Sequence, residues 1–233
     1  SFDRTNDSKI SNNTMGSTFA ENTYAVALTD SDSVGVKNNT IEWNATGVAK
    51  VAYGVSLIPN SGKTGGNNNI TNNTLTIYSA SSDAFGVYLD NFGTSNSNTI
   101  SDNTFDVDAG SYAFGVDFIN DVGTSNSNTI QDNTFNINAS SNSFGIRLAN
   151  VDTSMNSNTI SDNTFDINAS SGDTYGVYLF NQGTSMNSNT VSNNTINATS
   201  SSSPGFKSYG LRLSNAEYTN ASQNTINATA PSA

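Results

Sequence analysis

A polar phrase returns along this chain at a nearly constant interval. Residues 95–109 read SNSNTISDNTFDVDA, and residues 125–139 read SNSNTIQDNTFNINA. Each copy carries an apolar residue at the same place, and five of the seven steps between these anchors are 30 or 31 residues long. The anchors are Ile10, Val36, Ile70, Ile100, Ile130, Ile160, Val191 and Ala221. Self-similarity at such a period predicts an array of stacked structural repeats.

Within each repeat, apolar and polar residues alternate. Phe105 and Val107 fall on one side of an extended segment, and the polar residues between them fall on the other. A second phrase, aromatic-Gly-Val-x-Leu, keeps the same period, and by the same alternation we expect Phe114, Val116 and Phe118 to share one side. A period of two residues indicates strands. About three short strands per repeat predict one coil of an all-β parallel solenoid.

Stacked coils place equivalent residues above one another, about 4.8 Å apart. We expect one interior column through Ile100, Ile130 and Ile160 and another through Phe105, Phe135 and Phe165. The phrase aromatic-Gly-Val predicts an aromatic stack of Tyr24, Tyr53, Phe85, Phe114, Phe144, Tyr175 and Tyr209. An invariant Asn column runs through Asn13, Asn39, Asn73, Asn103, Asn133, Asn163, Asn194 and Asn224. Asn tolerates the left-handed conformation of tight turns, and its amide can form a hydrogen-bonded ladder.

The composition excludes several function classes. The net charge is −11 with eight Lys and Arg residues, which argues against nucleic acid as a partner. No apolar run reaches the roughly 20 residues of a membrane helix, so membrane insertion is not expected. Cysteine and histidine are absent, which removes disulfides and the commonest acid–base and metal-ligating side chain. We expect no cofactor.

The phrases GVYLDNFGTSNSNTISDNTF and FGIRLANVDTSMNSNTISDNTF resemble the repeats of right-handed parallel β-helix proteins. Similar repeats occur in the NosD-like copper-site assembly family, in pectate-lyase-like proteins and in many surface proteins. The resemblance covers about residues 8–228 and implies a right-handed β-helix of about eight coils, which we take as a single domain over residues 1–233. It does not fix a function, because this fold carries lyases, hydrolases, adhesins and passive fibres.

Two sets of side chains are candidates for binding. On the outward column of the Gly-Val-x-Leu segment, we expect Tyr88, Asp117, Arg147 and Tyr178 to offer rings and hydrogen bonds to a glycan. The alternative for this column is an ordinary exposed face on which Asp117 and Arg147 pair across coils. Columns of acids, such as Asp102, Asp132 and Asp162, would be needed for an enzyme or for calcium. Asn replaces these acids in other coils, so a solvated polar face explains them, and we expect neither a catalytic nor a metal site. Calcium at the Asp102 ladder is the alternative, because stacking places its like charges about 5 Å apart.

Ser and Thr residues raise two further possibilities. The pattern Ser97-x-Thr99-x-Ser101 recurs in later coils and is similar to an ice-binding face, but only one Thr per coil recurs. Asn-x-Ser/Thr sequons are abundant, and the candidates for glycosylation are Asn44, Asn138, Asn168, Asn197 and Asn227. Of these, we expect Asn138 and Asn168 at coil edges to be accessible, and sequons beside the Asn column, such as Asn72, to be less so.

The repeat continues to both ends of the sequence without a recognisable cap. Head-to-tail stacking of copies would join the coils built on the following residues: Ile10, Asn13, Met15, Ala221, Asn224 and Ile226. A fragment of a longer solenoid is the alternative. The sequence therefore predicts a non-enzymatic, extracellular structural solenoid that forms a filament, sheath or surface layer. Its alternatives are a glycan-binding adhesin or fibre segment, a polysaccharide-acting enzyme and an ice-binding protein.

Overall fold

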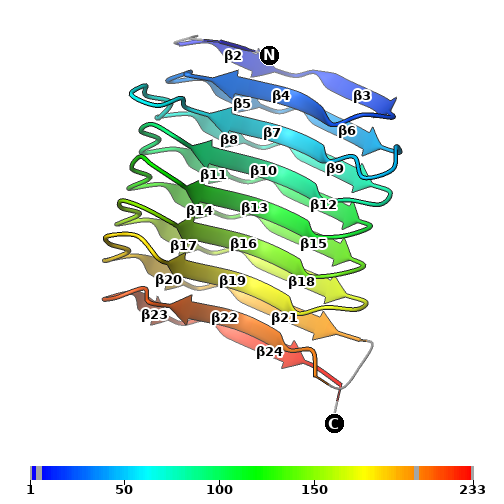
Figure 1. Cartoon of the computed structure of the whole chain (residues 1–233), viewed down its shortest axis with the longest axis vertical. Coiled ribbons are helices and arrows are strands. Elements are labelled where there is room, and N and C mark those ends of the chain that lie inside the picture. Colours follow the sequence, from blue (N-terminus) through cyan, green and yellow to red (C-terminus); the bar gives the residue numbers. More distant parts are fainter. Residues whose placement is uncertain (1, 4–6, 202–204, 232–233) are drawn as a thin grey trace.

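The computed structural model describes residues 2–3, 7–201 and 205–231 of the chain, which form a parallel β-solenoid (Figure 1). The solenoid has three eight-stranded sheets, and each strand pairs in parallel with the equivalent strand one coil away. The fold predicted from the repeat is therefore confirmed. The chain makes about seven turns of ~30 residues, slightly fewer than the eight coils expected.

We name the three sheets after their outward residues or strand length. The aromatic sheet contains β1 (Phe2–Asp3), β4 (Thr23–Thr29), β7 (Ala52–Ile58), β10 (Ala84–Asn91), β13 (Ala113–Asn120), β16 (Ser143–Asn150), β19 (Thr174–Asn181) and β22 (Ser208–Ser214). The short-strand sheet contains β2 (Lys9–Ser11), β5 (Gly35–Lys37), β8 (Asn69–Thr71), β11 (Thr99–Ser101), β14 (Thr129–Gln131), β17 (Thr159–Ser161), β20 (Thr190–Ser192) and β23 (Asn220–Ser222). The polar sheet contains β3 (Thr14–Phe19), β6 (Thr40–Ala45), β9 (Thr74–Ser79), β12 (Thr104–Ala109), β15 (Thr134–Ala139), β18 (Thr164–Ala169), β21 (Thr195–Ser200) and β24 (Thr225–Thr229).

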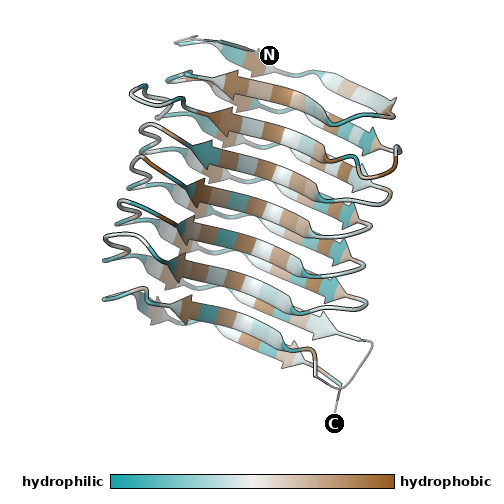
Figure 2. Cartoon of the chain, viewed as in Figure 1, coloured by the Kyte–Doolittle hydropathy of each residue, from teal (hydrophilic) through white to brown (hydrophobic). Residues whose placement is uncertain are grey.

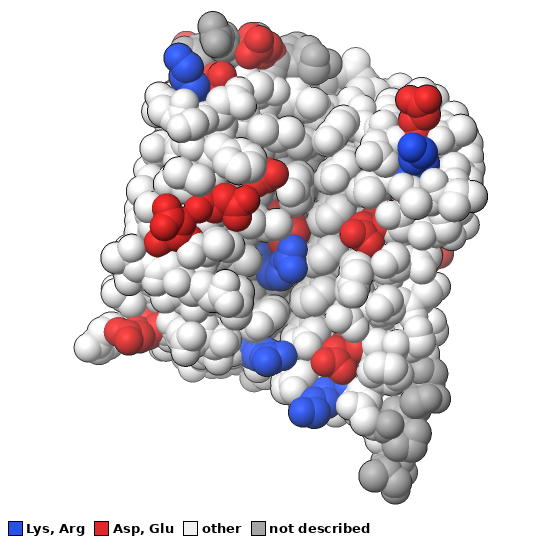
Figure 3. All heavy atoms as spheres, in the orientation of Figure 1, with Lys and Arg blue, Asp and Glu red and all other residues white. Residues whose placement is uncertain are grey.

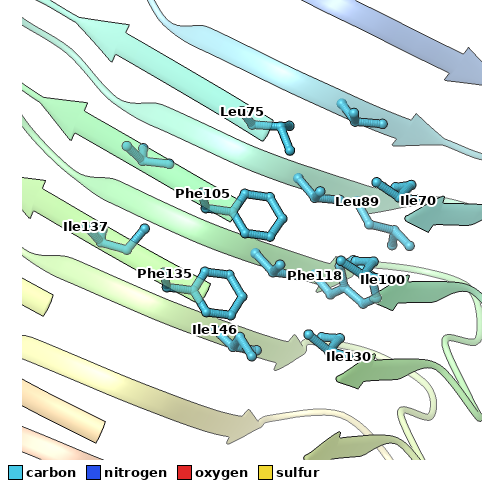
Figure 4. Close-up of a cluster of buried hydrophobic side chains, with 14 of the residues drawn as sticks. Ile70, Leu75, Leu89, Ile100, Phe105, Phe118, Ile130, Phe135, Ile137 and Ile146 are labelled. Carbon is cyan, nitrogen blue, oxygen red and sulfur yellow. The ribbon is translucent and has the colours of Figure 1, made fainter. Parts of the chain in front are cut away.

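The core is a set of apolar columns between the sheets. Phe105, Phe135 and Phe165 are buried and stack with ring centroids 4.8 Å apart. Ile100 and Ile130 form a second buried column from the short-strand sheet (Figure 4). The strands of the aromatic sheet carry long hydrophobic stretches, whereas those of the polar sheet alternate between hydrophobic and hydrophilic residues (Figure 2). The expected interior columns are therefore confirmed.

Asn ladders hold the corners of successive coils together. Asn133 is buried; its Oδ1 accepts the backbone N–H and the Nδ2 of Asn103, each at 3.0 Å. Its own Nδ2 donates to Oδ1 of Asn163, also at 3.0 Å. The predicted ladder is confirmed, but the left-handed residue is the one before it. Those residues have φ of 55–59° and are Asn12, Asn38, Asn72, Asp102, Asp132, Asp162, Asn193 and Gln223.

Further ladders were not predicted. One runs beside the short-strand sheet through Asn68, Asn98, Asn128, Asn158 and Asn189. The other lies where strands of the aromatic sheet end, through Asn91, Asn120, Asn150 and Asn181. In these three ladders a backbone or side-chain N–H of each Asn donates to the Asn of the following coil. A further ladder runs the opposite way, because the backbone N–H groups of Asn126, Asn156 and Asn187 each donate to Oδ1 of the Asn one coil earlier.

The aromatic-Gly-Val phrase does not follow the strict alternation that we expected. Val116 and Phe118 lie in the core, but Phe114 belongs to a separate cluster on the opposite side of the aromatic sheet. Gly115 explains the difference: a Cβ at this residue would lie 2.5 Å from the ring of Phe135, so this position faces the interior and only glycine fits. The pairing of β10 with β13 also skips Gly115. The expectation that Phe114, Val116 and Phe118 share a side is therefore wrong.

Among the described residues there is no helix long and apolar enough to cross a membrane.

Candidate functional site

The outer face of the aromatic sheet carries a continuous stack of seven rings. They lie in parallel with centroids 4.5–5.2 Å apart, in the order Tyr24, Tyr53, Phe85, Phe114, Phe144, Tyr175 and Tyr209. Phe85, Phe114 and Phe144 are nevertheless buried, because each ring face is covered by the next ring. The predicted stack is confirmed, but it forms a second apolar layer outside the sheet. It presents ring edges rather than ring faces to a ligand.

A hollow opens in the middle of this face. The outward column beside the stack contains the long side chains of Tyr88 and Arg147, with the shorter Asp117 between them. Because Asp117 does not fill the space that its neighbours reach, a cavity of about 370 Å³ remains above the edges of Phe85 and Phe114. Basic and acidic atoms meet in a depression near the centre of the molecule (Figure 3).

Asp117 and Arg147 form an ion pair at the floor of the hollow. Arg147 Nε donates to Oδ1 of Asp117 at 2.7 Å, and Nη2 donates to Oδ2 at 2.8 Å. The Asp117 side chain is fully buried, whereas 26% of the Arg147 side chain is exposed. The guanidinium carbon also lies 4.6 Å from the centroid of the Phe114 ring. The pairing of these two residues, one of the alternatives from the sequence, is confirmed.

The charges of this pair depend on each other. Burial raises the pKa of the Asp117 carboxyl, and the Arg147 guanidinium opposes that rise. Burial alone would lower the pKa of Arg147, but the Asp117 carboxylate raises it above its ordinary value. The two short bonds match a charge-assisted bidentate pair. The pair therefore presents no net charge to the hollow.

One wall of the hollow comes from turns that the sequence did not identify. Asp83, Tyr112 and Asn142 each precede a strand of the aromatic sheet and line the cavity. Asp83 Oδ1 accepts the backbone N–H of Tyr112 at 3.1 Å, and Asn142 Oδ1 accepts that of Asp173 at 2.8 Å. Tyr112 is 39% exposed. The residue types at this position differ from coil to coil, so no repeated phrase marks them.

Three of the four expected glycan-binding residues meet at the hollow, and the fourth lies outside it. Tyr88 borders it, and its hydroxyl donates to Oδ2 of Asp90 at 3.2 Å. Tyr178 instead packs against Tyr175, with ring centroids 5.2 Å apart. The guanidinium of Arg212 covers Tyr178 at 5.0 Å from its centroid. Tyr178 therefore lies outside the hollow, although it is the cross-strand neighbour of Arg147.

Tyrosine ionisation on this face is suppressed. Burial, followed by nearby negative charges, raises the pKa of Tyr53 to about 12. Burial, followed by the charge of Asp90, also raises the pKa of Tyr88. For Tyr175, burial and the hydrogen bond to Asp173 raise the pKa. Burial raises the pKa of Asp90 itself, although the hydrogen bond from Tyr88 lowers it.

We expect these shifts to make the protein sensitive to alkali. Unfolded tyrosines ionise at about pH 10, so the stability that these protonated phenols supply is complete below that pH. It should be lost as the pH rises through about 12, the folded pKa of Tyr53. Urea titrations at increasing pH, with tyrosinate absorbance as a second signal, check this. Tyr53→Phe should weaken the alkaline loss; a stability that is constant above pH 10 would contradict the prediction.

Other candidate residues occupy the corners and the polar sheet. Asp102, Asp132 and Asp162 are exposed corner residues in the left-handed conformation, a role that Asn72 fills one coil earlier. No group of three or more Asp, Glu, His or Cys in the described residues could hold a metal ion. The Ser/Thr pattern does not form one exposed face, because Ser97 is a corner residue and Ser101 is buried.

The sequon residues differ from expectation in their exposure. Asn138 and Asn168 lie within β15 and β18, rather than at coil edges, and are half-buried. Asn44 and Asn197 are also half-buried, in β6 and β21, whereas Asn227 is exposed in β24. The corner residue Asn72, which we expected to be less accessible, is exposed because its φ of 55° turns it out of the ladder.

The residues proposed for assembly lie in the first and last described coils. Ile10 is 8% exposed in β2, and Met15 is half-buried in β3. At the other end, Ile226 is 45% exposed in β24 and Ala221 is exposed in β23. Asn13 and Asn224 are the first and last members of the predicted ladder.

Comparison with known proteins finds no family model, no curated protein and no solved structure that matches this chain. The parallel β-solenoid is therefore established by the structure itself, and the narrower resemblance to NosD-like or pectate-lyase-like proteins stays a prediction.

Proposed function

We propose that this chain is a non-enzymatic, carbohydrate-binding β-solenoid of a surface adhesin or fibre, with the hollow of the aromatic sheet as its site. The observation that carries the proposal is the hollow itself. At about 370 Å³ it falls within the usual size range of small-molecule sites. The resemblance of the repeats to β-helix surface proteins supports an extracellular location.

The lining suits a pyranose ring better than an apolar ligand. Aromatic edges and the exposed ring of Tyr112 offer contact to the C–H groups of a sugar. Arg147 uses two of its nitrogens on Asp117 and keeps further N–H donors. Asn142 accepts a backbone N–H with Oδ1, which leaves its Nδ2 as a donor to a hydroxyl. Polar groups thus surround a small apolar floor.

Tyr112→Ala is expected to reduce retention on a glycan array at least tenfold, because it removes the one ring of the wall that is substantially exposed. Its effect on thermal stability should be small, since the side chain is 39% exposed. Tyr218→Ala is the matched control, because Tyr218 is 83% exposed and lies outside the hollow. Failure of the wild-type chain to bind any glycan on a broad array would refute the proposal.

A second candidate function is the self-assembling filament, sheath or surface layer expected from the sequence. The observation that favours it is the direction of the Asn ladder. Asn194 donates its backbone N–H and Nδ2 to Oδ1 of Asn224, at 3.0 and 2.9 Å. Asn13 donates in the same way to Asn39 at the other end. One end thus presents amide donors and the other presents the Asn13 Oδ1 acceptor, so only head-to-tail contacts match.

Such a junction would rest mainly on two sheets. β23 and β24 of one copy would meet β2 and β3 of the next, placing Ala221 against Ile10 and Ile226 against Met15. In the aromatic sheet, the two residues of β1 would meet the longer β22. The contact would cover Ile226, which is 45% exposed in this structure.

Ile226→Lys is expected to abolish self-association, because it would bury an unpaired charge at the junction. Light scattering and negative-stain microscopy at several concentrations measure the effect on the untagged chain. Val122→Lys, at a residue that is 52% exposed on a middle coil, is the control for added charge. A wild-type chain that stays monomeric at every concentration would exclude this function, and so would Ile226→Lys assembling normally.

A further inference from the structure

The hollow contains one carboxylate without a cationic partner. Its charged lining residues are Asp83, Asp117 and Arg147. Both oxygens of Asp117 are bound by Arg147, so that pair is neutral towards a ligand. Asp83 accepts one backbone N–H with Oδ1, and no described Lys or Arg forms an ion pair with it. The hollow is therefore left with the negative charge of Asp83.

The surroundings strengthen this negative potential. Asp90 lies near the Tyr88 end of the hollow, and its charge contributes to the raised pKa of Tyr88. The charge of Asp83 also contributes to the raised pKa of Asp117 and to that of Tyr53, so its negative charge acts on both residues. The whole chain carries a net charge of −11. A negatively charged ligand would therefore meet repulsion, because the only cation of the lining is already paired.

From these charges we infer that the hollow selects sugars bearing a protonated amine, such as 2-amino-2-deoxyhexoses, over neutral sugars, and that it rejects uronic acids. The inference rests on the proposed carbohydrate site. The ammonium group would bind the Asp83 carboxylate, beside Tyr112, whose backbone N–H this carboxylate accepts. Ring hydroxyls would then face the amide of Asn142 and the remaining N–H donors of Arg147.

The expected selectivity is moderate, because Asp83 is half-buried and water screens its charge. We expect glucosamine to bind about three- to tenfold more tightly than glucose, with glucuronate the weakest of the three. Since the difference is electrostatic, it should shrink as the salt concentration rises.

Asp83→Asn isolates this charge. The amide keeps an oxygen that can accept the Tyr112 backbone N–H, so the turn should be preserved while the charge is lost. Asp173→Asn is the matched control. Asp173 also precedes a strand of the aromatic sheet, and it accepts a backbone N–H from the following coil, that of Lys207 at 2.8 Å. Asp173 lies outside the hollow. Both variants change the net charge equally.

The test is a titration of glucosamine, glucose and glucuronate into the wild-type chain and both variants, followed by NMR at low and high salt. The inference predicts that Asp83→Asn removes the preference for glucosamine over glucose, while Asp173→Asn keeps the wild-type preference. Equal binding of the three sugars, or a glucosamine preference that survives in Asp83→Asn, would overturn the inference about charge but not the proposed carbohydrate site. Absence of binding by all three sugars, together with a blank glycan array, would overturn the carbohydrate site as well.

Discussion

Replacing Phe135 with alanine is expected to lower the free energy of unfolding by about 3–5 kcal/mol. Phe135 is 1% exposed and stacks between Phe105 and Phe165, with centroids 4.8 Å away on each side. The strands that carry these rings are held in register by their neighbours, so the stack cannot close over the vacancy. The loss therefore includes both the buried ring and the cavity that it leaves.

The measurement must resolve individual coils, because repeat arrays can unfold in parts. Hydrogen exchange monitored by mass spectrometry, alongside urea denaturation, meets this need. The largest gain in exchange should occur in β12, β15 and β18, the strands that carry the three rings. Phe92→Ala is the control, since Phe92 is 38% exposed and its loss should cost far less. Equal effects of the two substitutions would show that the phenylalanine column does not carry the core.

The repeat period was sufficient to predict the fold because each coil repeats the same contacts. Once Ile100, Ile130 and Ile160 are aligned, the parallel register and the interior columns follow from the strand geometry. The Asn column was predicted for the same reason. The ladder through Asn98 and Asn128 was missed although the phrase SNSNT repeats it, because we attributed that phrase to the Ser/Thr pattern.

The candidate site could be predicted only in part, because it depends on departures from the repeat. The hollow exists where Asp117 stands between two longer side chains, a difference that the sequence displays. Its wall is formed by Asp83, Tyr112 and Asn142, whose residue types share no pattern. The outward position of Phe114 also escaped prediction. Strict alternation assumes that every residue has a side chain on one face of the strand, and Gly115 has none.

Arg147→Ala is expected to cost about 3–5 kcal/mol, because it leaves the Asp117 carboxylate buried without its partner. A second substitution, Asp117→Ser, should restore most of this loss. Ser56 occupies the same column and is fully buried without a hydrogen-bond partner for its hydroxyl, so a serine fits sterically there and costs far less than an unpaired carboxylate. Arg212→Ala is the control: its guanidinium also covers aromatic rings but pairs with no described carboxylate, so its loss should cost about 1 kcal/mol or less.

The pH dependence separates lost charge pairing from lost packing. Burial already raises the pKa of Asp117, and removal of Arg147 should raise it further. A raised folded pKa means that the carboxyl stabilises the fold below the unfolded value of about 3.9 and loses that contribution as the pH rises. Because the unfolded state is the same in both proteins, the deficit of Arg147→Ala relative to wild type should be large near pH 7 and shrink as the pH falls from 7 towards 4, through the raised folded pKa of Asp117 in the variant. Urea titrations of both proteins across this range measure the difference; a deficit independent of pH would mean that Arg147 acts by packing against Phe114 and Phe144.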